Sequence, residues 1–419
     1  MQNMKKILLT VTGLCISTSA ISGGYRVALQ GQQALGMGHT GVAMTESAEV
    51  VFFNPAAMSL LESDSNIVAG ITLISSDTEY QNAQTNTSAK TDNPIGTPVG
   101  LYYTTKIDEK MSFGLGLYTP YGNTVEWEKD WAGSHLVNNI ELKAIYIQPT
   151  ISYKVNDQYS VGLGLSYISG DVKFNRNLNT STVDANGDRT NVSIKANGVS
   201  DWNFNLGVLA KPTDELSVGI SYRSEATMAA RNEPATFNNV PVSLQSTLTS
   251  PTKFNADLVL PAELTLGVAY DLDAKTILAF DFSRTFWGAY ESLDIDFANG
   301  QSSVNARNYK DSNVFRFGAQ HELDETIVLR GGIYFDKTPV QNGYFAPETP
   351  RNDSIGLTAG GSYAINKQLD LDFSLLILMF EEFNGSYDYI INSDGSTSTF
   401  GGDYLSSVTT LGFGVNYKF

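Results

Sequence analysis

The chain ends on the stretch Leu411-Gly412-Phe413-Gly414-Val415-Asn416-Tyr417-Lys418-Phe419, in which large apolar side chains alternate with small or polar ones. Successive side chains of a β-strand point to opposite faces, so a period of two predicts a strand with one apolar face. The same alternation fills 159–168 and 216–223, and it recurs in short segments from about residue 65 onward. Because no convincing long amphipathic helix is evident, the sequence predicts an all-β fold.

The connections between these segments alternate in length. Six are short and rich in turn-forming residues, near 106–109, 155–158, 211–214, 271–274, 322–325 and 365–367. Seven are longer and polar, around 77–94, 121–139, 172–190, 227–252, 298–310, 338–352 and 386–403. An even strand number with short turns at one end and long loops at the other is typical of outer-membrane barrels. We therefore expect residues 65–419 to form a 14-stranded antiparallel transmembrane β-barrel.

The composition agrees with this fold and excludes several functions. The chain has 42% hydrophobic and 17% charged residues, and its mean hydropathy of −0.14 suits strands that are apolar on one face only. A net charge of −17 argues against a nucleic-acid partner, because phosphate binding needs a basic surface. One Cys and three scattered His leave little material for catalysis or metal binding. We expect a protein that is not an enzyme and has no cofactor and no metal site.

Residues 1–22 have the features of a signal peptide. Lys5 and Lys6 precede an apolar core at 7–16, and small residues stand at 20 and 22. Ten apolar residues are about half the length of a transmembrane helix. Cleavage before Gly23 would remove two lysines and no acid, which lowers the net charge of −17 to −19. The leader and the chain length favour an outer-membrane barrel over a soluble β-sandwich, the main alternative.

The last residues add a further sign of export to the outer membrane. Tyr417-Lys418-Phe419 closes an alternating strand on a terminal Phe. This ending resembles the signal that the bacterial barrel-assembly machinery reads, with Tyr417 and Phe419 as its aromatic residues. We therefore expect that machinery to be a partner.

Residues 23–64 do not alternate, and we expect them to form a hatch, a plug domain inside the barrel lumen. The stretch is rich in glycine and carries apolar residues at 50–53 and at 60–61. A flexible periplasmic tail is the alternative. The apolar residues disfavour it, because a solvated tail has little apolar surface to bury.

Asn54-Pro55-Ala56 follows the glycine-rich stretch and lies before an apolar run, and it resembles the hatch motif of the FadL/TodX family. Members of that family are outer-membrane transporters of long-chain fatty acids and other hydrophobic compounds. Further short blocks match in order and spacing along nearly the whole mature chain, at 121–127, 222–225, 260–261, 286–287, 310–312, 329–332 and 338–340. The resemblance implies a 14-stranded barrel with an N-terminal hatch.

The resemblance also implies a mechanism of passive uptake. Ligand is captured at the extracellular loops, the hatch moves at Asn54-Pro55-Ala56, and the ligand leaves sideways into outer-membrane lipid. The lateral exit is expected at a kink of the third strand formed by Pro120, Tyr121 and Gly122. Proline cannot donate to a strand ladder and glycine often marks a bulge, although the plain end of a strand would look similar. Long-chain fatty acids are the first expected ligand, with aromatic hydrocarbons and alkanes as others.

The expected ligand-binding residues come from three places. Trp127 and Trp131 lie in the loop assigned to capture. By resemblance, Lys310 and one of Lys173 or Arg176 supply cations for a carboxylate head group. The apolar run at 375–380 breaks the period of two and places three apolar side chains toward the lumen. They either line a lipophilic pocket or pack against the hatch, and they are Leu376, Leu378 and Phe380.

Two other functions fit a barrel with long loops. A hydrophilic porin would need a charged constriction and no hatch, and a surface receptor or adhesion barrel would leave the hatch and the run at 375–380 unexplained. We expect a monomer, because one barrel with a lateral exit can work alone.

Overall fold

The computed structural model of the protein describes residues 24–178, 182–248, 250–392 and 395–419, so the expected signal peptide at 1–22 lies outside them. Fourteen strands form a closed antiparallel barrel, in which each strand pairs with the next and β1 pairs with the last strand, β20. The prediction of a 14-stranded barrel is confirmed. In order, the strands are β1 (Ser65–Asn82), β3 (Val99–Lys106), β4 (Met111–Glu126), β5 (Asn139–Lys154), β6 (Tyr159–Asn177), β7 (Asn191–Ala210), β8 (Leu216–Arg223), β11 (Glu263–Asp273), β12 (Thr276–Thr285), β15 (Ser312–Glu322), β16 (Ile327–Asp336), β17 (Ser354–Ala364), β18 (Leu369–Phe380) and β20 (Thr397–Lys418).

Six further strands extend this wall beyond one end of the barrel. Two of them continue neighbouring barrel strands after short breaks: β9 follows β8 after Ser224 and Glu225, and β10 precedes β11 across Pro261 and Ala262. The six strands are β2 (Thr87–Lys90), β9 (Ala226–Asn238), β10 (Thr252–Leu260), β13 (Ile295–Phe297), β14 (Ser302–Ser303) and β19 (Phe383–Ile391). Two 3-10 turns, η2 (Val242–Leu244) and η3 (Trp287–Ala289), lie in the loops.

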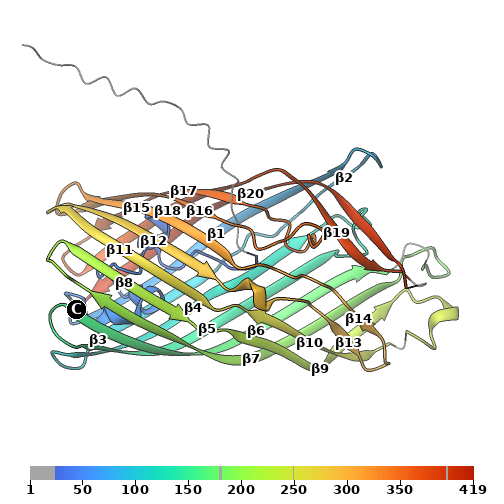
Figure 1. Cartoon of the computed structure of the whole chain (residues 1–419), viewed down its shortest axis with the longest axis horizontal. Helices are drawn as coiled ribbons and strands as arrows, with labels where there is room; N and C mark the ends of the chain where they lie inside the picture. The colour runs from blue at the N-terminus through green and yellow to red at the C-terminus, as the bar shows by residue number, and fades with distance from the viewer. Residues whose placement is uncertain (1–23, 179–181, 249, 393–394) are drawn as a thin grey trace, which may run out of the picture.

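Figure 1 shows the barrel on its side, with the C-terminus and the short turns at one end and β2, β13, β14 and β19 at the other. We call these the turn end and the loop end. Several strands run further toward the loop end than their apolar pattern predicts. β6 has 19 residues and β20 has 22, whereas about 10 residues cross a membrane. Parts of the predicted loops at 172–190 and 386–403 are therefore strand.

The outer face of the barrel is apolar and the inner face is small or polar. In β20, Leu411, Phe413 and Val415 are exposed on the outside, and Asn416 is fully buried on the inside. This is the alternation that a barrel wall in lipid requires, because its outward side chains meet hydrocarbon. Among the described residues, no helix has the length and apolarity to cross a membrane.

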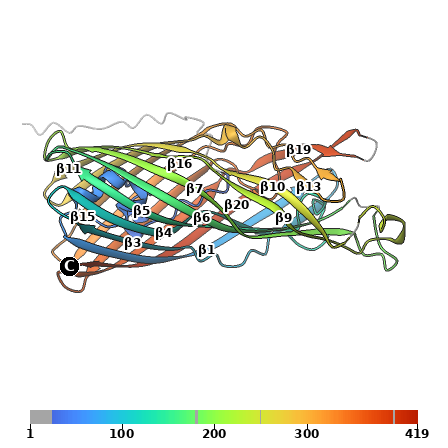
Figure 2. The ribbon, with the colours of Figure 1, turned by 90° about the horizontal axis from the view of Figure 1, so that it is seen from below.

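Residues 24–62 lie inside the barrel, in the half nearer the turns (Figures 1 and 2). They contain α1 (Gln32–Gly36), α2 (Val50–Phe53) and η1 (Pro55–Leu60). The η1 turn packs against β4, β5, β6 and β7, and α1 packs against β16, β17, β18 and β20 on other strands of the wall. We refer to residues 24–62 as the hatch.

Glycines in the wall make room for the hatch. A Cβ atom at Gly162 of β6 would lie 2.4 Å from the carbonyl carbon of Pro55, and one at Gly207 of β7 would lie 2.1 Å from Asn54 Oδ1. Any larger residue at these positions would displace η1 from the wall. The small inward residues of the strands are thus explained by the plug that they face.

Candidate functional site

The Asn54-Pro55-Ala56 motif ties two parts of the hatch to the wall. Asn54 Oδ1 accepts a hydrogen bond from Ala56 N at 3.1 Å, and Pro55 occupies the first position of η1, where its missing N–H is not needed. Asn54 Nδ2 donates to Val42 O at 2.8 Å and to Val208 O of β7 at 3.1 Å. One buried amide therefore joins the start of η1, a preceding hatch segment and the barrel.

The bend predicted at Pro120–Gly122 coincides with a β-bulge in β4, the third barrel strand. Tyr118 pairs with Tyr146 and Tyr121 pairs with Ala144, so two residues of β4 stand opposite the single residue Ile145. The strand continues to Glu126, so these residues are not a plain strand end. Whether the bend serves as an exit stays a prediction.

On its other side, the bulged part of β4 lacks a barrel partner. Along this edge, β4 pairs with β3 only as far as Tyr118, which lies opposite Gly100. The next bridge along the same edge of β4 joins Trp127 to Thr91. Within the described part of the chain, no barrel strand pairs with this edge of β4 between these two points. The wall is therefore interrupted at the bulge.

The start of the hatch occupies this open edge. Val27 N donates to Pro120 O at 2.8 Å, and Gly122 N donates to Tyr25 O at 3.2 Å, which makes a short antiparallel bridge of Arg26 with Tyr121. The side chain of Gln30 adds a hydrogen bond from Nε2 to Thr119 O at 2.9 Å. Residues 25–27 thus act as a short substitute strand at the interruption, and two backbone hydrogen bonds join them to β4.

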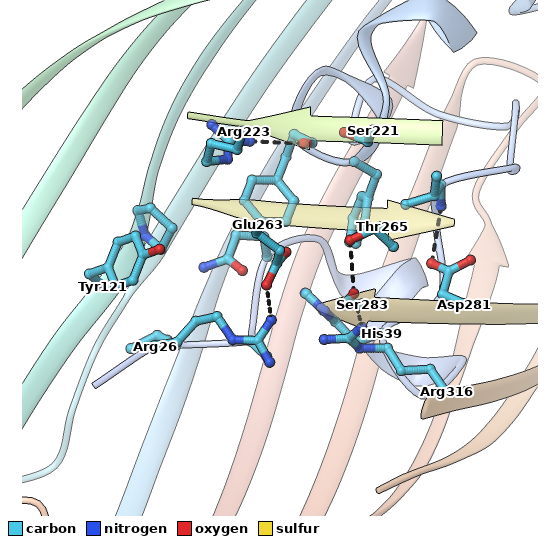
Figure 3. A pocket seen from close by; sticks show the side chains of 17 residues that line it. Arg26, His39, Tyr121, Ser221, Arg223, Glu263, Thr265, Asp281, Ser283 and Arg316 are labelled. Carbon is cyan, nitrogen blue, oxygen red and sulfur yellow. Dashed lines mark hydrogen bonds and ion pairs between the residues drawn. The ribbon is translucent and has the colours of Figure 1, made fainter. Parts of the chain in front are cut away.

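A charged pocket of about 610 Å³ lies behind this bridge (Figure 3). Arg26 forms ion pairs with Glu263 and, at 3.3 Å, with Asp336. Arg316 donates to Ser283 Oγ at 2.6 Å, and the Asp281 carboxylate accepts from the backbone of the hatch. Charged groups in and beside this pocket, which we call the polar pocket, therefore tie the hatch to β11, β12 and β16.

His39 of the hatch also lines the polar pocket (Figure 3). Burial, followed by the nearby Arg316 and Arg26, lowers the pKa of His39 well below its ordinary value. The imidazole is therefore neutral at physiological pH, and its Nε2 has no hydrogen-bond partner in the described part of the molecule.

A second space, which we call the apolar cavity, lies further toward the loop end and has an empty volume of about 780 Å³. Its walls are inward side chains of β5, β6, β7, β9 and β10, among them Leu142, Phe174, Ile194, Met228 and Phe254. Asn123, Glu348 and Thr349 supply its polar lining. Apolar walls with a few polar groups are typical of a site for a small hydrophobic molecule.

Tyr25 separates the two spaces. Its ring packs edge-on against Trp287 and Tyr290, with centroids 4.9 and 5.6 Å away, and its hydroxyl donates to Val259 O. Tyr25 lines the apolar cavity, and the next residue, Arg26, lines the polar pocket beside Pro120 and Tyr121. The segment that covers the wall interruption is therefore also part of the cavity wall.

The two tryptophans predicted for ligand capture are packed together. The rings of Trp127 and Trp131 stack at a centroid distance of 4.1 Å and are only 4% and 5% exposed. Their indole N–H groups donate to Pro347 O at 3.0 Å and to Val137 O at 2.8 Å. Both residues belong to an aromatic cluster near the loop end with Tyr80 and Tyr404, and their part in capture stays a prediction.

The three predicted head-group cations lie in separate places. Lys173 is exposed and pairs with Glu141 at 2.6 Å, on the face of β6 opposite to Phe174. Lys310 is exposed near the loop end. Arg176 donates to Ser303 Oγ at 2.8 Å and lines an outer hollow of about 1210 Å³. They do not converge on one site, and none of them lines the apolar cavity.

The apolar run of β18 has the predicted register. Leu376, Leu378 and Phe380 belong to the inner face, while Ile377 and Met379 are exposed on the outside. Leu376 is 1% exposed and packs with Leu35 of α1, Val314 and Tyr334. Of the two interpretations left open by the sequence, packing against the hatch is the one that this contact supports.

The sequence analysis missed the apolar cavity, although a signal for it is present. In β5, β6 and β7 the alternation reverses its sense toward the loop end, where charged residues face outward and apolar residues face inward. Lys143, Lys173 and Lys195 are exposed, and their neighbours Leu142, Phe174 and Ile194 line the cavity. Such a reversal indicates that, toward the loop end, the inner face of these strands is the apolar face that is shielded from water.

The chain resembles outer-membrane transporters over its whole length. Residues 13–419 match the family described as outer membrane protein transport protein (OMPP1/FadL/TodX). The long-chain fatty acid transport protein of Escherichia coli (strain K12) is 22% identical over 437 residues, which cover 95% of this chain and 97% of that protein. Outer membrane protein P1 of Haemophilus influenzae is 21% identical over 465 residues, which cover both chains completely.

Solved structures share the fold. The crystal structure of a Pseudomonas aeruginosa FadL homologue has a TM-score of 0.83 and 17% identity, covering 94% of this chain and all of that one. The Pseudomonas putida toluene transporter TodX has a TM-score of 0.70 and 17% identity, covering 94% and 99%. The family comprises outer-membrane transporters of hydrophobic compounds, not enzymes, and the protein is an outer-membrane β-barrel. The match over residues 13–419 shows that the chain belongs to the OMPP1/FadL/TodX family.

Proposed function

We propose that the protein carries hydrophobic compounds into the outer membrane by passive diffusion, with a lateral exit at the bulge of β4. A compound enters from the loop end and occupies the apolar cavity. The segment at 25–27 then leaves the open edge of β4, and the compound moves sideways into lipid. Transport is downhill, because the sequence shows no nucleotide-binding or energy-coupling motif.

One observation carries this proposal: the segment at 25–27 covers the wall interruption, and its first residue, Tyr25, borders the apolar cavity. Tyr25 and Gly122 share a backbone hydrogen bond of 3.2 Å, and the ring of Tyr25 lines the cavity. A ligand that pushes on Tyr25 therefore acts directly on the residues that cover the exit. Movement of the hatch at Asn54-Pro55-Ala56 would accompany the change, since Asn54 joins η1 to the rest of the hatch.

A hydrophilic porin fits these observations less well. Such a channel needs a continuous water path, whereas the hatch packs against the wall on several sides of the lumen in the turn half and the loop half contains an apolar cavity. A receptor or adhesion barrel would not need a wall interruption that is covered by a segment of the hatch and not by a barrel strand.

The exit can be tested with a disulfide that locks residue 27 to residue 122. A Cβ atom at Gly122 would lie 3.5 Å from Val27 Cγ2, and the mature chain has no other cysteine because Cys15 is in the signal peptide. We expect Val27→Cys/Gly122→Cys to block the release of radiolabelled hexadecanol and hexadecanoate into proteoliposome lipid when oxidised. Dithiothreitol should restore release, and each single-cysteine variant serves as a control. Undiminished release from a protein whose disulfide is verified by mass spectrometry would refute the lateral exit.

The closing seam of the barrel contains the proposed assembly signal. Tyr417 pairs with Ile67 of β1 and with Leu369 of β18, and Phe419 O accepts a hydrogen bond from Ser65 N at 2.8 Å. Both aromatic side chains are exposed on the outside. We propose that the barrel-assembly machinery binds this strand before β1 closes on it, and that the folded protein acts as a monomer.

A further inference from the structure

The apolar cavity offers an incoming ligand no positive charge. Glu348 is the one Asp, Glu, Lys, Arg or His residue of its described lining, and it is an acid. Its carboxylate is paired with Arg307, and the two side chains are only 6% and 7% exposed. Arg307 is therefore already neutralised by a buried partner, and it lies outside the lining.

With one exception, the basic side chains of the surrounding strands point away from the cavity. The exception, Arg176, lies on the inner face of β6, but it donates to Ser303 Oγ at 2.8 Å and lines the outer hollow instead of the cavity. Because the strand period is two, Lys143, Lys173 and Lys195 lie on the face opposite to the lining residues beside them. Two further exposed cations, Arg231 and Lys253, lie next to lining residues of β9 and β10 in the same way. None of the internal residues outside the described ranges is a Lys, Arg or His.

A carboxylate would be unfavourable in this cavity. An ionised group in apolar surroundings is destabilised unless a cation and hydrogen bonds compensate for its lost hydration. Here the lining contains no basic residue, and Arg307 beside it is already paired with Glu348, so the lining supplies no cation for a second carboxylate. An uncharged molecule of the same chain length needs no such cation and keeps all of its apolar contacts.

The polar lining of the cavity does suit a hydroxyl group. Asn123 Nδ2 donates to Glu348 O at 2.6 Å, whereas Asn123 Oδ1 has no partner although the residue is only 6% exposed. A buried acceptor without a donor is a cost that a ligand O–H can remove. Thr349 also lines the cavity, and its hydroxyl shares a 3.1 Å hydrogen bond with Tyr309.

We propose that the apolar cavity selects uncharged lipophiles that bear a hydroxyl group, and that it discriminates against ionised fatty acids. This inference rests on the proposed uptake of hydrophobic compounds, and it replaces the fatty acid by the matching alcohol as the preferred ligand.

The test compares 1-hexadecanol with hexadecanoate, which share a chain length and differ in the head group. Equilibrium binding of each radiolabelled probe is measured at neutral pH with the mature protein in lipid nanodiscs. We expect the alcohol to bind at least about tenfold more tightly than the acid. Equal or tighter binding of the acid overturns this inference and leaves the proposed uptake function standing. Failure of both probes to bind overturns both.

Two variants sharpen the assignment. Glu348→Gln removes the acidic lining group and frees Arg307, so the affinity for hexadecanoate should rise about tenfold or more, with little change for the alcohol. Lys310→Ala should leave both affinities unchanged, because Lys310 is exposed away from the cavity. A loss of hexadecanoate binding in Lys310→Ala, or no gain in a folded Glu348→Gln barrel, contradicts the proposal. The comparison of the two probes on the unaltered protein does not depend on either variant.

Discussion

The two halves of one strand, β5, have opposite polarity. In the half nearer the turns, Ile147 and Ile151 face outward and Gln148 faces inward. In the half nearer the loops, Lys143 faces outward and Leu142 faces inward. The same chain segment is thus built like a membrane barrel at one end and like a soluble protein at the other.

The difference follows from what surrounds each half. Hydrocarbon surrounds the turn half, so its outer side chains must be apolar and its polar groups must lie inside. Water surrounds the loop half, so apolar side chains turn inward to escape it. An apolar binding space can therefore form inside the loop half, while the small or polar inner face of the turn half packs against the hatch.

The largest expected effect comes from breaking the polarity of the outer face. Ile147→Arg places a charge in hydrocarbon, which should destabilise the barrel by roughly 2–4 kcal/mol if the site is near the bilayer centre. The measurement is urea unfolding in phospholipid vesicles. The matched control, Lys195→Ile, changes the outer face of the loop half and should leave stability nearly unchanged. Similar losses in both variants would show that the two halves share one environment.

The next effect concerns the inner face of the loop half. Ile194→Asp puts a carboxylate into the apolar cavity and should weaken binding of 1-hexadecanol on the order of a hundredfold. Its neighbour Lys195 is exposed on the other face, so Lys195→Asp should bind the alcohol normally. Wild-type affinity in Ile194→Asp would place the ligand elsewhere.

The inner face of the turn half should respond differently. Leu376→Ala leaves a space beside Leu35 of α1 and should destabilise the local packing of the hatch by about 2–5 kcal/mol. Hydrogen exchange of residues 32–36, followed by mass spectrometry, measures this loss. Alcohol affinity should change by no more than about threefold, because Leu376 does not line the apolar cavity. A large loss of affinity without faster exchange would assign Leu376 to the ligand.

The smallest expected effect is a pH dependence of the hatch. Burial, followed by the nearby Asp372, raises the pKa of Glu49 from 4.5 to about 7. The folded hatch therefore holds this proton more tightly than the unfolded hatch does, so its stability should fall as pH rises from about 4.5 to about 7. Faster exchange at Gln33 and Ala34, whose N–H groups face the carboxyl at 3.4 and 3.3 Å, would report the change. Glu49→Gln should abolish this part of the pH dependence, and an unchanged slope would assign it to other groups.

Much of the wall was predictable from sequence, because strand period and turn residues are local signals. The strand count and the inward face of Leu376 follow directly from them. The strand period of two also predicts that Lys173 and Arg176 lie on opposite faces of β6, because they are three residues apart. The reversed alternation of β5, β6 and β7 can also be read from the sequence. Its meaning, however, depends on knowing that the loop halves of these strands lie side by side in the wall.

The site was less predictable, because its parts come from distant segments. The bridge of residues 25–27 with the bulge of β4 joins an irregular segment to a strand, and no periodic pattern sets that register. Trp127 and Trp131 look available for ligand as loop residues, but their burial depends on Pro347 and Val137 accepting their N–H groups. Glu348 gains its importance only from its pairing with Arg307.

The position of the bulge along the barrel axis has a consequence for where a released compound would enter the membrane. The bulge lies opposite Ile145, which is the first outward apolar residue of β5 after Lys143. We expect the proposed opening at this level to face the border between the lipid head groups and the acyl chains of the outer leaflet, because the apolar outer face of β5 begins here. A long molecule with one hydroxyl group would therefore leave the protein at the depth where its head can stay hydrated and its tail can join the lipid chains. In the proposed mechanism, the position of the bulge would make departure from the barrel and insertion into the leaflet a single step.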